Sequence, residues 1–89
     1  MMKDIELLSW ILRGSQRREI LKVMSHPMIP AQIYKEAVKL NPKITRNSVS
    51  DVLKTFRENK LAECINPSET KGRIYKLTSL GEKIKKKLL

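Results

Sequence analysis

Apolar residues recur along the first half of the chain at the three- and four-residue spacing that is typical of amphipathic helices. The first such segment covers residues 4–13 and stops at Gly14. A second follows with Ser15 as its predicted N-cap, and it ends before Pro27, because the residue preceding a proline disfavours helical geometry. The predicted inward faces consist of Ile5, Leu8, Ile11 and Leu12 in the first helix and of Ile20, Leu21, Val23 and Met24 in the second.

Two further helices are predicted, separated by a short connection. Pro30 opens the first at a position where a missing N–H costs nothing, and Asn41-Pro42 ends it. Thr45 caps the second, which covers about residues 46–58 and has the most regular apolar spacing in the chain. Their predicted inward faces consist of Ile33, Ala37, Val38 and Leu40 and of Val49, Val52, Leu53 and Phe56.

The last third of the chain predicts a β-hairpin followed by a helix. Residues 61–66 and 74–78 read as short strands, and the loop 67–73 between them contains proline, serine and glycine. A final helix is expected over 79–89. The predicted fold is mainly α with a small antiparallel β-hairpin, in the order helix, helix, helix, helix, strand, strand, helix.

Composition limits the function classes. Residues 1–89 are enough for one domain with one small core. Apolar runs of two or three residues and the lack of a secretory leader predict a cytoplasmic protein with no membrane span. With only one cysteine, Cys64, and one histidine, His26, we expect no metal, no cofactor and no enzymatic activity. Cys64 is interpreted as a half-buried strand residue rather than a redox sensor, and His26 as a loop residue.

The charge is the strongest functional signal. The 19 Lys and Arg residues against 9 Asp and Glu give a formal net charge of +10. Residues up to Pro42 contribute 7 − 4 = +3, and the residues after it contribute 12 − 5 = +7. This excess favours a polyanionic partner, nucleic acid before an anionic membrane surface, although adaptation to a salty or hot cytosol is an alternative explanation.

Residues 12–84 resemble archaeal and bacterial winged helix-turn-helix transcriptional regulators of the broad MarR-like and ArsR-like kind, and the resemblance implies a prokaryotic, archaeal source. The segments that carry the resemblance are LRGSQRREILKVM, IPAQIYKEA, ITRNSVSDVLKTFRENKLAECINP and KGRIYKLTSLGEKI. The resemblance implies sequence-specific binding of double-stranded DNA, with the helix at about 46–58 in the major groove and the loop 67–73 as the wing.

The residues themselves fit these roles. If the apolar face of the helix at 46–58 is buried, its outward face carries polar and basic groups suited to base edges and phosphates. Arg46 is suited to guanine and Asn47 to adenine, while Asp51 is interpreted as positioning Arg46 or Lys54. The predicted DNA-binding residues are Arg46, Asn47, Ser48, Ser50, Lys54, Lys71 and Arg73.

Simpler explanations stand beside these roles. A solvated polar helix face, a capping function for Ser48 and a merely basic hairpin tip would account for the same residues. Secondary candidates for contacts with the phosphate backbone of DNA are Arg17, Arg18, Tyr34 and Lys35. The lysines of the last helix are interpreted as a solvated face.

Both predicted terminal helices, residues 4–13 and 79–89, carry more apolar surface than one small domain needs. Because regulators of the resembled architecture usually pair through terminal helices, the resemblance implies a homodimer on a roughly palindromic site. The alternative is that these residues close the core of the monomer. The alternative function is a winged-helix protein–protein interaction module of a transcription, replication or other assembly, since fold alone does not decide function. Structured RNA is a third option.

Overall fold

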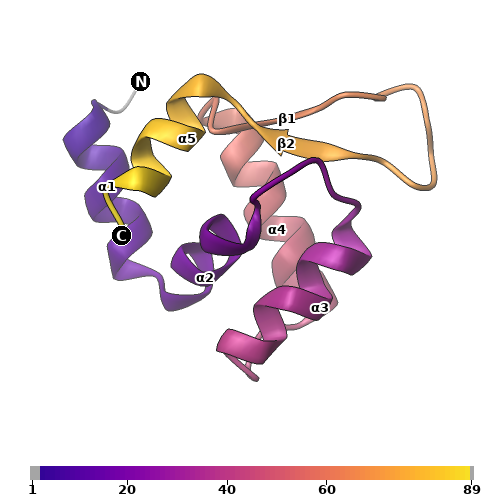
Figure 1. The fold of residues 1–89 in the computed structure, drawn as a ribbon, viewed down its shortest axis with the longest axis horizontal. Helices are drawn as coiled ribbons and strands as arrows, with labels where there is room; N and C mark the ends of the chain where they lie inside the picture. Colours follow the sequence, from indigo (N-terminus) through magenta and orange to yellow (C-terminus); the bar gives the residue numbers. More distant parts are fainter. Residues whose placement is uncertain (1–2, 89) are drawn as a thin grey trace.

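The computed structural model describes residues 3–88 of the chain (Figure 1). Within this range it contains five α-helices and one two-stranded antiparallel sheet, so the predicted mainly helical class with a small hairpin is confirmed. The elements are α1 (Asp4–Arg13), α2 (Ser15–Val23), α3 (Pro30–Leu40), α4 (Arg46–Glu58), β1 (Ala62–Cys64), β2 (Tyr75–Leu77) and α5 (Ser79–Lys86). The helix predicted over 79–89 is thus shorter, and Leu89 lies outside the described residues, as do Met1 and Met2.

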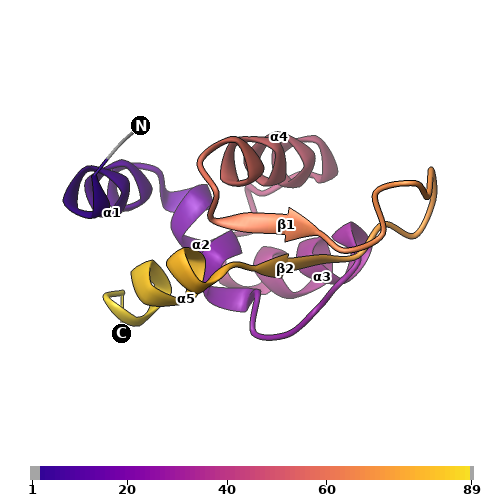
Figure 2. The same cartoon turned by 90° about the horizontal axis from the view of Figure 1, so that it is seen from above.

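The molecule has two distinct ends along its long axis. Helices α2, α3 and α4 pack against one another, and α4 also packs against β1. Helices α1 and α5 lie together at one end, which we call the terminal-helix end (Figures 1 and 2). The hairpin loop, residues 65–74, projects from the opposite end, which we call the loop end.

A single hydrophobic core lies among all five helices and the hairpin. Burying a Leu, Ile or Phe side chain contributes about 1.5–3 kcal/mol relative to leaving it exposed, so this cluster is the main source of stability. Phe56 of α4 is fully buried, and Trp10 of α1 packs on its ring edge-to-face with centroids 6.2 Å apart. The largest fully buried side chains are Phe56, Leu7, Ile11, Ile20, Leu21, Met24, Ile33, Leu53, Leu61, Ile84 and Val49.

The predicted inward face of α1 is wrong in part. Leu7 and Ile11 are buried, whereas Ile5 is 75% exposed and Leu12 is 48% exposed. The stripe chosen from spacing is rotated because α1 is apolar around much of its circumference. Its orientation is set by the contacts of α1 with α2 and α5, which local spacing does not encode.

Two further details differ from the sequence prediction. Leu40 shares a stripe with the buried Ile33 but is 53% exposed, because the last turn of α3 lies at the edge of the molecule (Figure 1). Gly14, rather than Ser15, occupies the N-cap of α2 and at the same time the C-cap of α1. The two helices are therefore joined by one extended residue without a side-chain cap.

The hairpin has one backbone pairing that the sequence did not reveal. Strands β1 and β2 pair antiparallel, with Cys64 opposite Tyr75. Met28, in the segment between α2 and α3, forms an isolated antiparallel bridge with Tyr75 through hydrogen bonds of 2.9 and 2.8 Å. Because a single bridge has no alternating pattern, only the structure shows that the hairpin is fastened to the segment preceding α3.

The turn after α4 holds α5 in place. Lys60 has a positive φ of 64°, and the N–H of Leu61 donates to the carbonyl of Phe56 at 2.8 Å, which ends α4. The hydroxyl of Thr78 donates to the Lys60 carbonyl and accepts from the N–H of Gly81, so Thr78 caps α5. A Cβ at Gly81 would lie 2.0 Å from the Leu61 carbonyl oxygen, so this close approach requires glycine.

Candidate nucleic-acid interface

The N-terminal half of α4 presents its polar side chains at the surface, as the sequence predicted. Thr45 is the N-cap, and its hydroxyl accepts from the Ser48 N–H at 3.1 Å. Val49, Leu53 and Phe56 are buried, which leaves the opposite side of the helix outward. The exposed residues of this helix are Arg46, Asn47, Ser50, Asp51, Lys54, Arg57 and Glu58.

Ser48 has a capping function. Its hydroxyl accepts from the Thr45 N–H at 2.7 Å and lies 2.9 Å from the Thr45 hydroxyl, so the two residues form a reciprocal capping box. The same hydroxyl donates to the Thr45 carbonyl oxygen at 3.0 Å. The hydrogen bonds of Ser48 therefore agree with the simpler explanation, a capping function. Contact of Ser48 with DNA stays a prediction.

Arg46 lies against α3. Its guanidinium carbon lies over the ring of Tyr34, 5.4 Å from the ring centroid, within the range of a cation–π interaction. The two residues belong to a surface hollow of about 210 Å³ between α3 and α4. We call it the α3–α4 hollow; its lining residues are Pro30, Ala31, Tyr34, Arg46 and Ser50.

Asp51 lies on the other flank of α4. It shares a shallow hollow with Trp10, Arg17, Val52 and Thr55, where α4 meets α1 and α2. The ion pairs found among residues 3–88 do not include Asp51, so the structure does not reproduce the expected pairing with Arg46 or Lys54. The two flanks of α4 therefore differ, with a cation facing α3 and a carboxylate facing α1.

The hairpin loop is held by its own side chains. Asn66 donates from Nδ2 to the Gly72 carbonyl at 3.1 Å and accepts from the Ile74 N–H at 2.7 Å. The sequence reasoning did not single out Asn66, although an Asn in a turn segment signals backbone bonding of this kind. Gly72 has φ of 66°, which a glycine adopts without strain.

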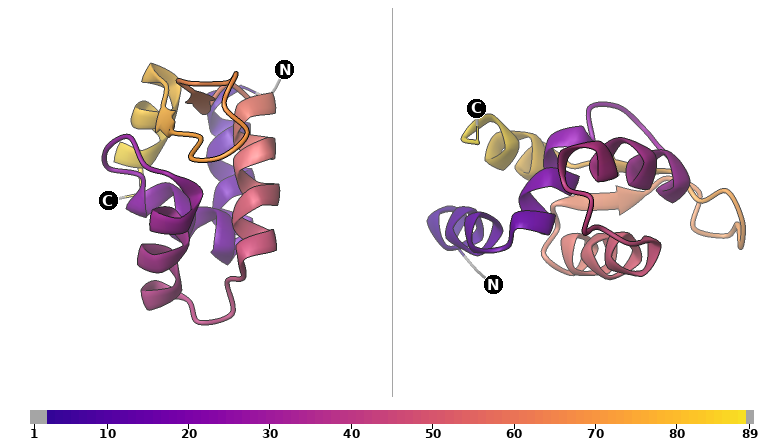
Figure 3. Two further views of the ribbon diagram at one scale, coloured as in Figure 1. Left: turned by 90° about the vertical axis from the view of Figure 1, so that its right-hand side faces the viewer. Right: turned by 90° about the horizontal axis from the view of Figure 1, so that it is seen from below.

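The two predicted cations of the loop differ in their surroundings. Lys71 is exposed. The Nε–H of Arg73 donates to the Glu69 carbonyl at 2.6 Å, so Arg73 braces the loop while its side chain remains half-exposed. Figure 3 (left) looks onto the loop end, where the hairpin loop lies in front, above α3 and beside the C-terminal half of α4. The N-terminal end of α4 points toward this same end of the molecule (Figure 2).

At the terminal-helix end, several cations have partners within the chain. Lys83 forms an ion pair with Asp4, and its ammonium hydrogen bond lowers the pKa of Asp4 below the ordinary value of 3.8. Lys85 Nζ donates to the Met24 carbonyl at 3.4 Å. Arg17, one of the secondary DNA candidates, lies over the ring of Trp10 at 4.6 Å. These groups connect α5 to α1 and α2 and also brace the junction of α1 and α2.

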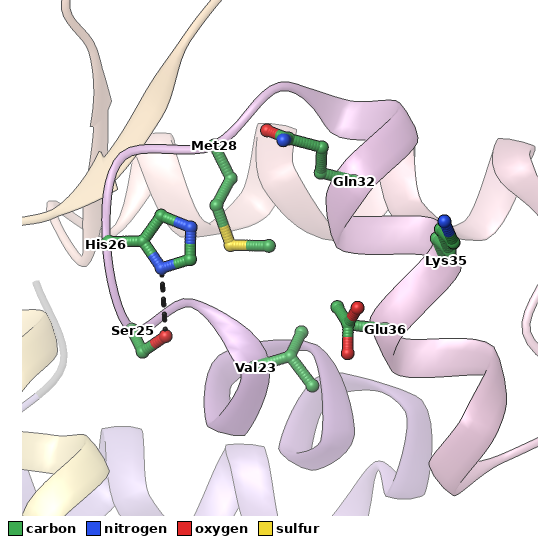
Figure 4. Close-up of a pocket in the computed structure, with 7 residues that line it drawn as sticks. All are labelled: Val23, Ser25, His26, Met28, Gln32, Lys35 and Glu36. Carbon is green, nitrogen blue, oxygen red and sulfur yellow. Dashed lines mark hydrogen bonds between the residues drawn. The ribbon is translucent and has the colours of Figure 1, made fainter.

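A larger hollow lies elsewhere, between the α2–α3 connection and α3 (Figure 4). It has a volume of about 390 Å³, and the Ser25 hydroxyl lies 3.1 Å from His26 Nδ1 on its wall. Nucleophilic catalysis by Ser25 with His26 as the base would need a third group that orients the imidazole ring. Glu36, the carboxylate lining this hollow, is bonded instead to Lys39 Nζ at 3.3 Å.

Residues 3–88 were also searched for other kinds of site. They contain no group of three or more His, Cys, Asp or Glu side chains arranged to hold a metal ion. In the same range, no helix has both the length and the apolar character needed to cross a bilayer.

Comparison with protein-family models, curated proteins and solved structures found no match to this chain. Its family is therefore not shown by similarity. The arrangement of α3, α4 and the hairpin loop is the observation from which a function is inferred.

Proposed function

We propose that this protein is a winged-helix transcriptional regulator that binds double-stranded DNA sequence-specifically. The order of elements supports this proposal: three helices that pack together are followed by an antiparallel hairpin with a projecting loop. The formal net charge of +10 favours a polyanion as the partner. In this proposal α4 is the recognition helix and the hairpin loop is the wing.

The observation that carries the proposal is that the N-terminal end of α4, whose polar side chains are exposed, points toward the end of the molecule from which the hairpin loop projects (Figure 2). An α-helix fits the major groove, and the residues near its N-terminus reach base edges. The first turn of α4 contains a cation and no acidic residue, which suits an anionic partner. A loop beside it can follow the phosphate backbone or enter the minor groove.

Each exposed residue then has a specific role. Arg46 donates to guanine O6 and N7, and Asn47 bonds adenine; Ser50, on the wall of the α3–α4 hollow, contacts a base or a phosphate. Lys54, two turns into α4, reaches a phosphate. Lys71 supplies an exposed charge at the loop, whereas Arg73 acts mainly by holding the loop in shape.

We further propose that two copies bind a two-fold symmetric site. Most of the apolar surface of the terminal helices closes the monomer core, since Leu7, Ile11 and Ile84 are buried. The exposed Ile5 and Leu12 remain as candidate dimer contacts on α1. Sedimentation equilibrium at tens of micromolar tests this point, and a monomer at that concentration would remove the dimer from the proposal.

The decisive experiment is fluorescence anisotropy of a mixed-sequence duplex titrated with the protein over a salt series. Binding that weakens log-linearly with salt, with a slope of about 0.9 per neutralised phosphate, is the expected result. An unrelated basic protein of similar charge gives the baseline for non-specific binding. No binding at low salt would overturn the proposal.

One observation favours a protein partner as the second candidate. The exposed side of α4 also carries Asp51 and Glu58, so it is not uniformly basic. Such a mixed face suits a protein surface of alternating charge. A stable complex with another protein that weakens as salt is added, together with no affinity for the duplex, would support this alternative.

A further inference from the structure

Arg46 occupies a position that is unfavourable for helix stability. It is the first residue of α4, where the helix dipole places partial positive charge, and the first turn contains no acidic residue. Arg46 is exposed, and the ion pairs found among residues 3–88 do not include it. Its cation–π interaction with Tyr34 joins it to α3.

Tyr34 is well placed to orient this side chain. It lies on α3 next to the fully buried Ile33, is itself half-buried, and packs against the core. The ring interacts with Arg46 at 5.4 Å on one wall of the α3–α4 hollow, while Pro30, Ala31 and Ser50 complete the lining. A guanidinium held by an aromatic ring, rather than by a carboxylate, keeps its N–H donors available for another partner.

We propose that Tyr34 is a positioning residue that determines the base preference of Arg46. This inference rests on the proposed DNA-binding function and deepens it. The Tyr34 ring holds the guanidinium on the α3 side of α4 before DNA arrives, so less side-chain freedom is lost when the donors meet a guanine edge. Bidentate donation to guanine depends on the direction of the guanidinium plane, whereas attraction to a phosphate depends mainly on charge. Loss of the ring should therefore reduce discrimination between sequences more than affinity for DNA in general.

The test uses the full chain and two DNA probes. One is the duplex that the wild-type protein enriches most strongly from a random-sequence pool, and the other is a mixed-sequence duplex. Tyr34→Leu removes the ring and keeps an apolar side chain, while Tyr34→Phe is the matched control that keeps the ring without the hydroxyl.

Tyr34→Leu should weaken binding to the enriched duplex about fivefold to tenfold and change binding to the mixed-sequence duplex less than about twofold. Tyr34→Phe should bind both probes like the wild type. In an Arg46→Ala background, Tyr34→Leu should have no further effect, because the group that the ring positions is gone.

Three outcomes would overturn the positioning role while leaving DNA binding intact. Equal losses of affinity on both probes would mean that Tyr34 contacts the phosphate backbone of DNA. A loss of affinity in Tyr34→Phe would assign the effect to the hydroxyl. Additive losses in the double variant with Arg46→Ala would show that Tyr34 and Arg46 act independently. Failure of the wild type to bind either probe would instead overturn the proposed function, and the base-reading role of Arg46 with it.

A second measurement keeps the test decisive if Tyr34→Leu does not fold. In the NMR spectrum of the wild type without DNA, the ring current of Tyr34 should shift the Arg46 Hδ protons upfield of their ordinary positions. The shift should persist in Tyr34→Phe. Ordinary Hδ positions in the wild type would show that the ring does not hold the guanidinium.

Discussion

The two ends of the molecule use their positive charge differently. At the terminal-helix end, Lys83 pairs with Asp4 and Lys85 donates to the Met24 carbonyl, so cations connect α5 to α1 and α2. At the loop end, the ion pairs found within residues 3–88 involve neither Arg46 nor Lys71. Net charge by itself thus does not locate a binding surface. A cation with partners inside the fold contributes to stability, whereas an exposed cation without a nearby carboxylate is available to an outside partner.

The largest effect on stability should come from a substitution where α5 packs closely against the turn after α4. Gly81→Ala places a Cβ against the Leu61 carbonyl oxygen, a backbone atom that cannot move aside cheaply. We expect the free energy of unfolding to fall by about 3 kcal/mol and Tm by more than about 10 °C, measured by circular dichroism.

Gly72→Ala in the hairpin loop is the matched control for this substitution. Nothing lies within 4 Å of the added Cβ, and the cost arises from the φ of 66°, about 1 kcal/mol. A larger loss of stability from Gly72→Ala than from Gly81→Ala would contradict the division into a structural end and a binding end.

The next effect concerns specific DNA binding. Arg46→Ala should cost about 1–3 kcal/mol on the enriched duplex and relax base preference at one position. The free energy of unfolding should stay equal or rise slightly, because a cation leaves the N-terminus of α4. Lys83→Ala at the terminal-helix end, where the ammonium pairs with Asp4, is the control and should bind both duplexes like the wild type.

A smaller effect is expected from the loop. Lys71→Ala should weaken binding to all sequences by a similar factor and lower the salt slope by about one unit, because Lys71 is exposed and contributes charge alone. Anisotropy across a salt series with both duplexes measures this slope. Selective loss on the enriched duplex would instead make Lys71 a base-reading residue.

The smallest effect is a pH dependence at the terminal-helix end. Lys83 lowers the pKa of Asp4 in the folded protein, so the ionised carboxylate stabilises the fold. This contribution is complete above the ordinary pKa of 3.8 and is lost as the pH falls through the lower folded pKa. Asp4→Asn should therefore have a slightly lower Tm than the wild type at pH 7. At low pH, where the wild-type carboxylate is protonated, the difference in Tm between the two proteins should be smaller. An equal difference in Tm at pH 7 and at low pH would show that the Asp4–Lys83 pair does not stabilise the fold through ionisation of Asp4.

The elements that could be predicted are those encoded by neighbouring residues. The cap at Thr45, the proline start of α3 and the apolar stripe of α4 involve residues within a few positions of one another, and all three appear in the structure. The polar face of α4 could be predicted for the same reason, since burial of Val49, Leu53 and Phe56 leaves the other side outward. The predicted bounds of this helix, about 46–58, therefore agree with the observed bounds, Arg46–Glu58.

Contacts between distant elements could not be predicted in this way. Helix α1 is apolar on more than one side, and its docking on α2 and α5 selects Leu7 and Ile11 for the core over Ile5 and Leu12. The place of Asp51 in a hollow with Trp10 and Arg17 likewise depends on how α4 lies beside α1 and α2.

By itself, the sequence determined the number of helices, the hairpin, the position of the most regular helix and the excess of positive charge. Only the tertiary structure decided that Met28 pairs with Tyr75, that α5 requires glycine at position 81, and that Arg46 rests on Tyr34. The physical reason is the range of the interactions. Periodicity and capping act within a few residues, while these three contacts join segments whose meeting depends on how the whole core packs.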